Sequence, residues 1–71
     1  MSPMQNIRVN IFKKRQAEFA ALIGVNQSTV SRWDNGVEPD RADLAAIRDA
    51  ASREGIEWKD EWFFERPEDA A

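Results

Sequence analysis

The stretch QSTVSRWDN, residues 27–35, carries side chains that could hydrogen-bond to the edges of nucleic-acid bases. Gln27 can form a pair of hydrogen bonds with N6 and N7 of adenine, and Arg32 can do so with O6 and N7 of guanine. The short hydroxyl side chains of Ser28 and Ser31 would let a helix backbone approach a groove closely. Base contacts are therefore predicted at Gln27, Ser28, Ser31 and Arg32.

Three consecutive cations, Lys13, Lys14 and Arg15, have the chemistry for phosphate contacts. Contacts of this kind supply most of the non-specific affinity of proteins for DNA, and they position a protein without reading its sequence. A solvated charged turn is the alternative, and it would be favoured if the triplet stood alone. Its place directly before Gln16, where a helix is expected to begin, favours phosphate contact.

Charge is divided unevenly between the two halves of the chain. The net charge of the 71 residues is −3, which argues against a polyanionic partner. Residues 1–33, however, contain five Lys and Arg residues and one acid, whereas residues 34–71 contain five such cations and twelve acids. The sign of a local surface decides what that surface attracts. The N-terminal half, at +4, is therefore the half predicted to face DNA, and the acidic half is expected to face away from it.

Composition excludes several classes of function. Without cysteine or histidine, the chain has no disulfide and none of the usual zinc or iron ligand sets. Catalysis would depend on Asp, Glu, Lys and hydroxyl groups, and no set of these converges, so neither an enzyme nor a cofactor is expected. No stretch resembles a signal peptide or the roughly 18 apolar residues of a membrane span. We expect a soluble, cytoplasmic, nucleoid-associated protein with no metal site and no small-molecule effector.

The spacing of apolar residues predicts four helices that would position these groups. The first spans residues 4–10, and the second begins at Gln16 and ends at Gly24. The third runs from residue 27 to residue 34 or 35, and the fourth runs from about residue 41 to a stop at residue 55. The side chains of Asn26 and Asp40 are expected to cap the third and fourth helices.

Each predicted helix has an apolar face that would be buried. The predicted buried residues are Ile7 and Ile11 in the first helix, Phe19, Ala20 and Ile23 in the second, Val30 and Trp33 in the third, and Leu44, Ile47 and Ala51 in the fourth. Arg8 and Asp34 are expected to form an ion pair between the first and third helices, of the surface kind that contributes about 0 to 1 kcal/mol.

An aromatic and acidic segment, residues 56–71, follows the fourth helix. Trp58 and Trp62 are one helical turn apart, which favours a short helix that packs on the core. A dimer interface is the alternative, because Trp and Phe are enriched at the centres of interfaces. A platform for single-stranded nucleic acid is disfavoured, since acids surround the rings. The residues assigned to the core or to a dimer interface are Trp58, Trp62, Phe63 and Phe64.

The sequence QAEFAALIGVNQSTVSRWDNG, residues 16–36, resembles the helix-turn-helix of the Cro and phage-repressor family, also called XRE-like. In such a motif the second helix enters the major groove of DNA. The resemblance implies that Gln16 clamps a phosphate and that Thr29 and Asn35 lie near the DNA backbone. It also implies that Ala20 lets the two motif helices cross. The chain departs from the family at Arg15, where a serine or threonine cap is typical.

The resemblance implies a single domain, residues 1–71, with a compact all-α fold of four to five helices, similar to the lambda-repressor DNA-binding domain. It implies a sequence-specific transcriptional regulator that binds double-stranded DNA. The simplest form is a homodimeric repressor or autorepressor, of phage, prophage or small-operon type, on a palindromic operator. The alternative is a protein-interaction module, antitoxin-like or an adaptor, that uses the aromatic C-terminal segment.

Overall fold

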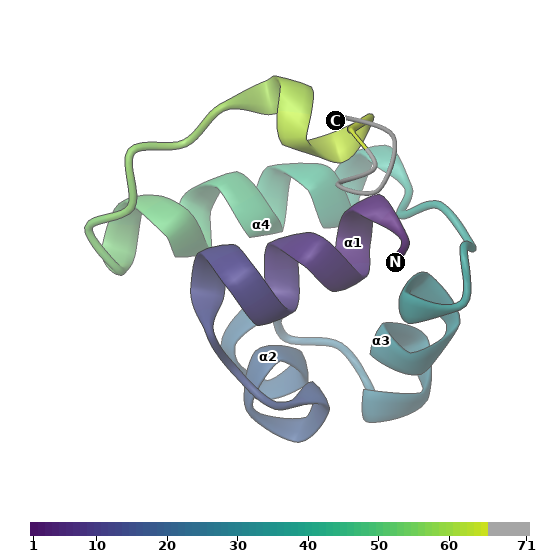
Figure 1. Cartoon of the computed structure of the whole chain (residues 1–71). Helices are drawn as coiled ribbons and strands as arrows, with labels where there is room; N and C mark the ends of the chain where they lie inside the picture. The colour runs from purple at the N-terminus through teal and green to yellow at the C-terminus, as the bar shows by residue number, and fades with distance from the viewer. Residues whose placement is uncertain (66–71) are drawn as a thin grey trace.

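Helices form all of the regular structure in residues 1–65, the part of the chain that a computed structural model describes (Figure 1). The predicted all-α class is confirmed for this part, which contains no strand. The end of the predicted acidic tail, residues 66–71, lies outside it. The elements are α1 (Pro3–Asn6), the π-helix η1 (Ile7–Phe12), α2 (Gln16–Ile23), α3 (Gln27–Asp34), α4 (Arg41–Arg53) and the 3₁₀-helix η2 (Asp60–Phe63).

The first helical segment is longer than the predicted span of residues 4–10. It begins at Pro3, because Ser2 caps it by accepting a hydrogen bond from the backbone N–H of Gln5 at 3.1 Å. It continues as η1 as far as Phe12, whose side chain is buried. Lys13 then ends it with a left-handed backbone conformation at φ 57°.

The helices α2 and α3 begin and end where the sequence predicts. Gly24 ends α2 with φ 88°, a conformation that favours glycine, and the carbonyl of Ala20 accepts hydrogen bonds from the N–H groups of residues 24 and 25. Asn26 occupies the cap position of α3, but its side chain makes no capping hydrogen bond, so this part of the prediction is wrong. Its backbone carbonyl accepts from the N–H of Thr29 at 3.0 Å instead.

The predicted cap of α4 is confirmed. The carboxylate of Asp40 accepts a hydrogen bond from the N–H of Asp43 at 2.8 Å, and the carboxylate of Asp43 accepts one from the N–H of Asp40 at 3.3 Å. The inner face differs from the prediction at two positions. Leu44 is half-buried and lies outside the core, whereas Ala50 is fully buried, because the helix turns the face that carries Ile47 and residues 50–51 inward.

A single apolar core joins the helices. At its centre Phe19 packs edge-to-face against Phe12 and Trp33, with ring centroids 5.0 Å and 6.4 Å apart. No polar or charged side chain is buried among residues 1–65. The buried core residues are Met4, Ile7, Phe12, Phe19, Ala20, Ile23, Val30, Trp33, Ile47, Ala50 and Ala51.

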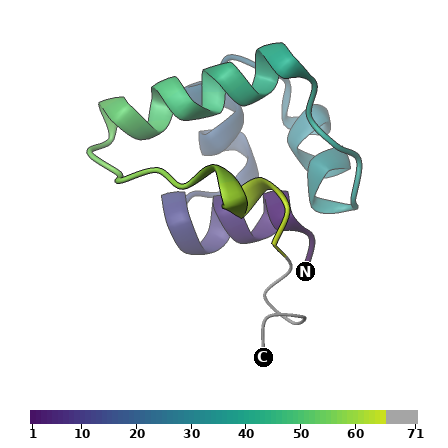
Figure 2. The ribbon, with the colours of Figure 1, turned by 90° about the horizontal axis from the view of Figure 1, so that it is seen from above.

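The segment after α4 folds back over α4 and α1 (Figures 1 and 2). Trp58, Trp62 and Phe63 are half-buried and pack against the core. The prediction of a short helix through both tryptophans is wrong, since η2 begins at Asp60 and Trp58 precedes it. The ring of Trp58 lies 6.3 Å from that of Phe12 and 5.1 Å from that of Trp62. Phe64 is 80% exposed and takes no part in this packing.

The radius of gyration, 11.0 Å, is that of a compact globule of this length. Among the described residues, no helix combines the length and the apolar character needed to cross a membrane.

Asp60 attaches the C-terminal segment to α4. Its Oδ1 accepts hydrogen bonds from Arg48 and from the indole N–H of Trp58, both at 2.8 Å, and these bonds, with the charge of Arg48, hold the pKa of Asp60 below its ordinary value. Because the pKa is lower in the folded state, the ionised carboxylate stabilises the fold at pH values above the unfolded-state pKa, about 3.9 for Asp. This stabilisation is lost as the pH falls through the folded-state pKa.

We therefore expect Asp60→Asn to lower the Tm at pH 7, and we expect the difference from the wild type to shrink as pH falls and the wild-type carboxyl becomes protonated. Thermal unfolding followed by circular dichroism at neutral and acidic pH measures the difference. Glu57→Gln, at a nearby exposed acid, is the control and should keep the wild-type Tm at pH 7. A Tm deficit in Asp60→Asn that does not shrink as the pH is lowered would contradict this role.

Candidate nucleic-acid interface

Helix α3 has two faces with different roles. Val30 and Trp33 are buried against the core and fix its orientation. Gln27, Ser28 and Arg32 are exposed. Ser31, the fourth predicted base contact, is half-buried. Residues 27–33 contain no acid, so the exposed face offers hydrogen-bonding groups and one positive charge.

Arg32 and Thr29 contact each other on the surface of α3. A terminal nitrogen of Arg32 donates a hydrogen bond to the hydroxyl of Thr29 at 3.2 Å. The sequence predicts a phosphate contact for Thr29 and a base contact for Arg32. The contact indicates that Thr29 also orients the guanidinium, because residues three apart are neighbours on a helix.

Two predicted phosphate contacts are engaged within the protein. The side-chain amide of Asn35 donates to the carbonyl of Ser31 at 2.9 Å and thereby closes the end of α3. The side-chain amide of Gln16 donates to Oδ2 of Asp34 at 2.9 Å. Gln16 therefore joins the start of α2 to the end of α3.

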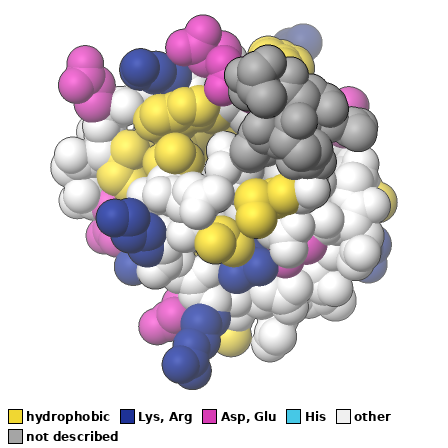
Figure 3. Space-filling view, in the orientation of Figure 1, with side chains coloured by type: hydrophobic (Ala, Val, Ile, Leu, Met, Phe, Trp, Pro, Cys, Tyr) yellow, Lys and Arg dark blue, Asp and Glu magenta, His cyan; other side chains and the backbone are white. Residues whose placement is uncertain are grey.

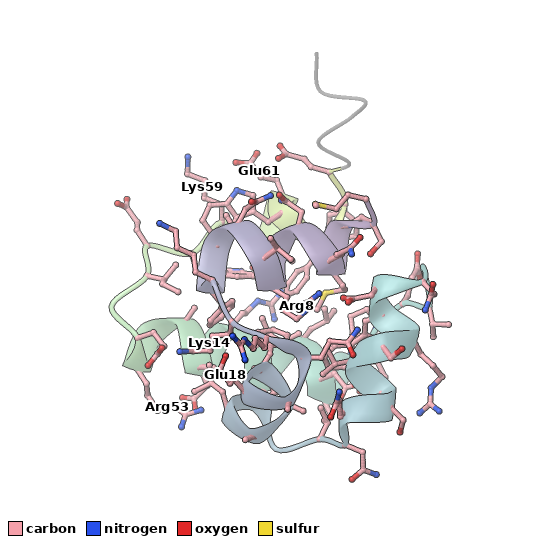
Figure 4. The ribbon with its side chains drawn as sticks, turned by 60° about the horizontal axis from the view of Figure 1, so that its bottom comes forward. Arg8, Lys14, Glu18, Arg53, Lys59 and Glu61 are labelled. Carbon is pink, nitrogen blue, oxygen red and sulfur yellow. The ribbon has the colours of Figure 1, made fainter. Side chains whose placement is uncertain are left out.

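Asp34 is the centre of a polar network that joins three elements. Its two carboxylate oxygens accept hydrogen bonds from Nε and a terminal nitrogen of Arg8, at 3.3 Å and 2.7 Å. Arg8 also donates to the carbonyl of Lys14 at 3.0 Å. The predicted ion pair between Arg8 and Asp34 is confirmed, but it is not a surface pair, because the two side chains are only 13% and 9% exposed. Figure 4 shows Arg8 in the interior between α1 and the α2–α3 pair.

The basic triplet between η1 and α2 does not act as one unit. Lys13 and Arg15 are exposed. Lys14 pairs with Glu54, just beyond α4, with its Nζ 3.1 Å from the carboxylate. The backbone N–H of Arg15 donates to the carboxylate of Glu18 at 3.0 Å, which caps the start of α2 without a serine or threonine. The side chain of Glu18 in α2 thus partly replaces the cap that the sequence lacks at Arg15.

Charges of both signs occur on each side of the molecule. Figure 4 shows Lys14 and Glu18 together beside α2, and Lys59 and Glu61 together on the far side of α1, in the C-terminal segment. The exposed side chains of Lys13, Arg15 and Arg32 all belong to the segment that contains α2 and α3. The folded chain therefore keeps part of the charge asymmetry of its sequence, although Glu54 and Glu18 reduce it.

Two functional contributions were missed from the sequence. Ser2 caps α1, and its hydroxyl also donates to the carbonyl of Trp33 at 3.0 Å, which ties the N-terminus to the end of α3. The Ser-Pro pair at residues 2 and 3 is a helix-start signal that could have revealed the cap. The bond from Gln16 to Asp34 had no such signal, because it joins residues 18 positions apart.

Residues 1–65 contain no cluster of three or more acidic side chains that could hold a metal ion. Neither a known protein family, nor a curated protein, nor a solved structure matches this chain.

The Arg8–Asp34 pair should stabilise the fold more than a surface ion pair does, because both side chains are nearly buried and share two hydrogen bonds. We expect a coupling free energy of about 1 to 3 kcal/mol in a double-mutant cycle with Arg8→Met and Asp34→Asn. Urea unfolding of the four proteins measures it. The exposed pair Arg53–Asp49 is the matched control, expected at about 0.3 to 0.5 kcal/mol. Equal coupling energies in the two cycles would contradict this prediction.

Proposed function

We propose that the protein is a sequence-specific regulator of transcription that binds double-stranded DNA, with α2 and α3 forming a helix-turn-helix. The observation that carries this proposal is the two-faced character of α3. One face is anchored by Val30 and Trp33, while Gln27, Ser28 and Arg32 are exposed in a stretch, residues 27–33, that contains no acid. A helix that enters the major groove needs both properties.

The turn between α2 and α3 supports the same proposal. The buried Ala20 and the left-handed Gly24 let the two helices pack closely with only residues 24–26 between them. This is the layout that presents a second helix to a groove while the first crosses the backbone. The resemblance to the Cro and phage-repressor family covers these same residues.

In the proposed complex, α3 lies in the major groove, and Lys13 and Arg15 contact phosphates. The acidic C-terminal segment faces away, so the charge asymmetry orients the protein as it approaches DNA. We expect a homodimer that binds two half-sites about 34 to 36 Å apart, as is usual for this motif. Occupying such an operator would repress transcription by excluding polymerase.

Selection from a random duplex library tests the proposal. We expect the purified protein to enrich a palindrome with half-sites about one helical turn apart. Gln27→Ala and Arg32→Ala should each cost about 1 to 3 kcal/mol at one base position and relax the preference there. Arg41→Ala, an exposed arginine at the start of α4, is the control and should keep the preference. A folded protein that enriches no sequence would overturn the proposal.

The phosphate contacts predict a different kind of loss. Arg15→Ala should weaken binding to all duplexes alike and lower the salt slope of the binding constant by about 1. Lys14→Ala should have a smaller effect, because Glu54 already pairs with its ammonium group. Fluorescence anisotropy on specific and random duplexes at several salt concentrations separates these effects. Lys59→Ala is the control on the acidic side, and a sequence-selective loss in Arg15→Ala would contradict the assignment.

A further inference from the structure

A cleft of about 160 Å³ lies where the N-terminus, the end of α3 and the C-terminal segment meet. Its floor includes the buried side chains of Met4 and Trp33. Phe63 and Phe64 form one wall, and the connector from α3 to α4 forms another. The cleft is therefore lined by apolar side chains together with Ser2 and Glu38, and it has room for one bulky side chain.

The rim of the cleft exposes apolar side chains that the fold does not need. Phe64 is 80% exposed and Val37 is 52% exposed, although both line the cleft. The neighbouring rings of Trp58, Trp62 and Phe63 pack against the core, so the exposure of Phe64 is not a general property of the aromatic segment. Figure 3 shows hydrophobic side chains gathered on the face that carries α1 and the C-terminal segment, with both acidic and basic side chains along its upper edge.

Glu38 is the charged side chain that lines the cleft. It is exposed, and it forms no ion pair with another residue of the range 1–65. No lysine or arginine of that part of the chain lines the cleft.

We propose that the cleft between Trp33, Val37 and Phe64 binds a segment of another protein that carries a bulky apolar side chain flanked by Lys or Arg. The apolar side chain would fill the space beside Trp33, and a flanking cation would pair with Glu38. A second copy of this chain is the poorer occupant, because a two-fold interface here would bring two Glu38 carboxylates together. The homodimer proposed above must therefore use a different face. This inference does not depend on DNA binding.

A titration of the isotope-labelled full chain with a synthetic peptide tests this proposal. The probe has a central Leu-Phe pair, flanked on each side by one Lys and one Arg, with blocked ends. We expect saturable shifts of the amide signals of residues 36–38 and 63–64 and of the indole signal of Trp33. Affinity should fall at high salt, since screening weakens exposed charge pairs.

Three variants and a control separate the contributions. Phe64→Ala and Val37→Ser should each weaken binding about tenfold, which corresponds to about 1.4 kcal/mol. Glu38→Lys should weaken it by a similar factor at low salt. Both apolar side chains are exposed, so these variants should fold, which circular dichroism checks. Val9→Ser, at an exposed valine of η1 outside the cleft, should bind like the wild type.

Three results would overturn the proposal. The first is a peptide with Gly-Gly in place of Leu-Phe that binds equally well, since the attraction would then be electrostatic alone. The second is the absence of shifts at the cleft at millimolar peptide. The third is the appearance of the same shifts when the protein alone is concentrated, because the occupant would then be a second copy.

Discussion

A continuous series of aromatic contacts holds this small fold together. Trp33 of α3 packs on Phe19 of α2, Phe19 on Phe12 of η1, and Phe12 on Trp58 of the C-terminal segment. A chain of 71 residues has little apolar surface to bury, so each large ring has to serve two elements at once. The position of α3, and with it the exposed face of that helix, follows from these contacts.

Hydrogen bonds between polar side chains fix how the helices are oriented around the aromatic core. Asp34 joins Arg8 of η1 and Gln16 of α2 at the end of α3, while Ser2 holds the N-terminus to the same end. Apolar packing has little directional preference, whereas hydrogen bonds fix the relative rotation of helices. The network thus orients the surface that we propose for DNA, and it occupies Gln16 in the free protein.

The two proposed binding surfaces use opposite charges and meet at Trp33. On one side, α3 presents amide, hydroxyl and guanidinium groups. On the other, the cleft presents apolar side chains beside Glu38. Trp33 is a buried residue of α3 and also lines the cleft, so the packing that orients α3 also shapes the cleft.

The sequence by itself determined where α2, α3 and α4 begin and end, because this information is local. Glycines at residues 24 and 36, the Asp40 cap and the apolar spacing of α2, α3 and α4 placed those elements correctly. The tertiary structure alone decided how side chains from distant elements pair. Three features depend on how the helices dock, which no local pattern encodes. They are the hydrogen bond from Gln16 to Asp34, the low exposure of the Arg8–Asp34 pair and the exposure of Phe64 beside three packed rings.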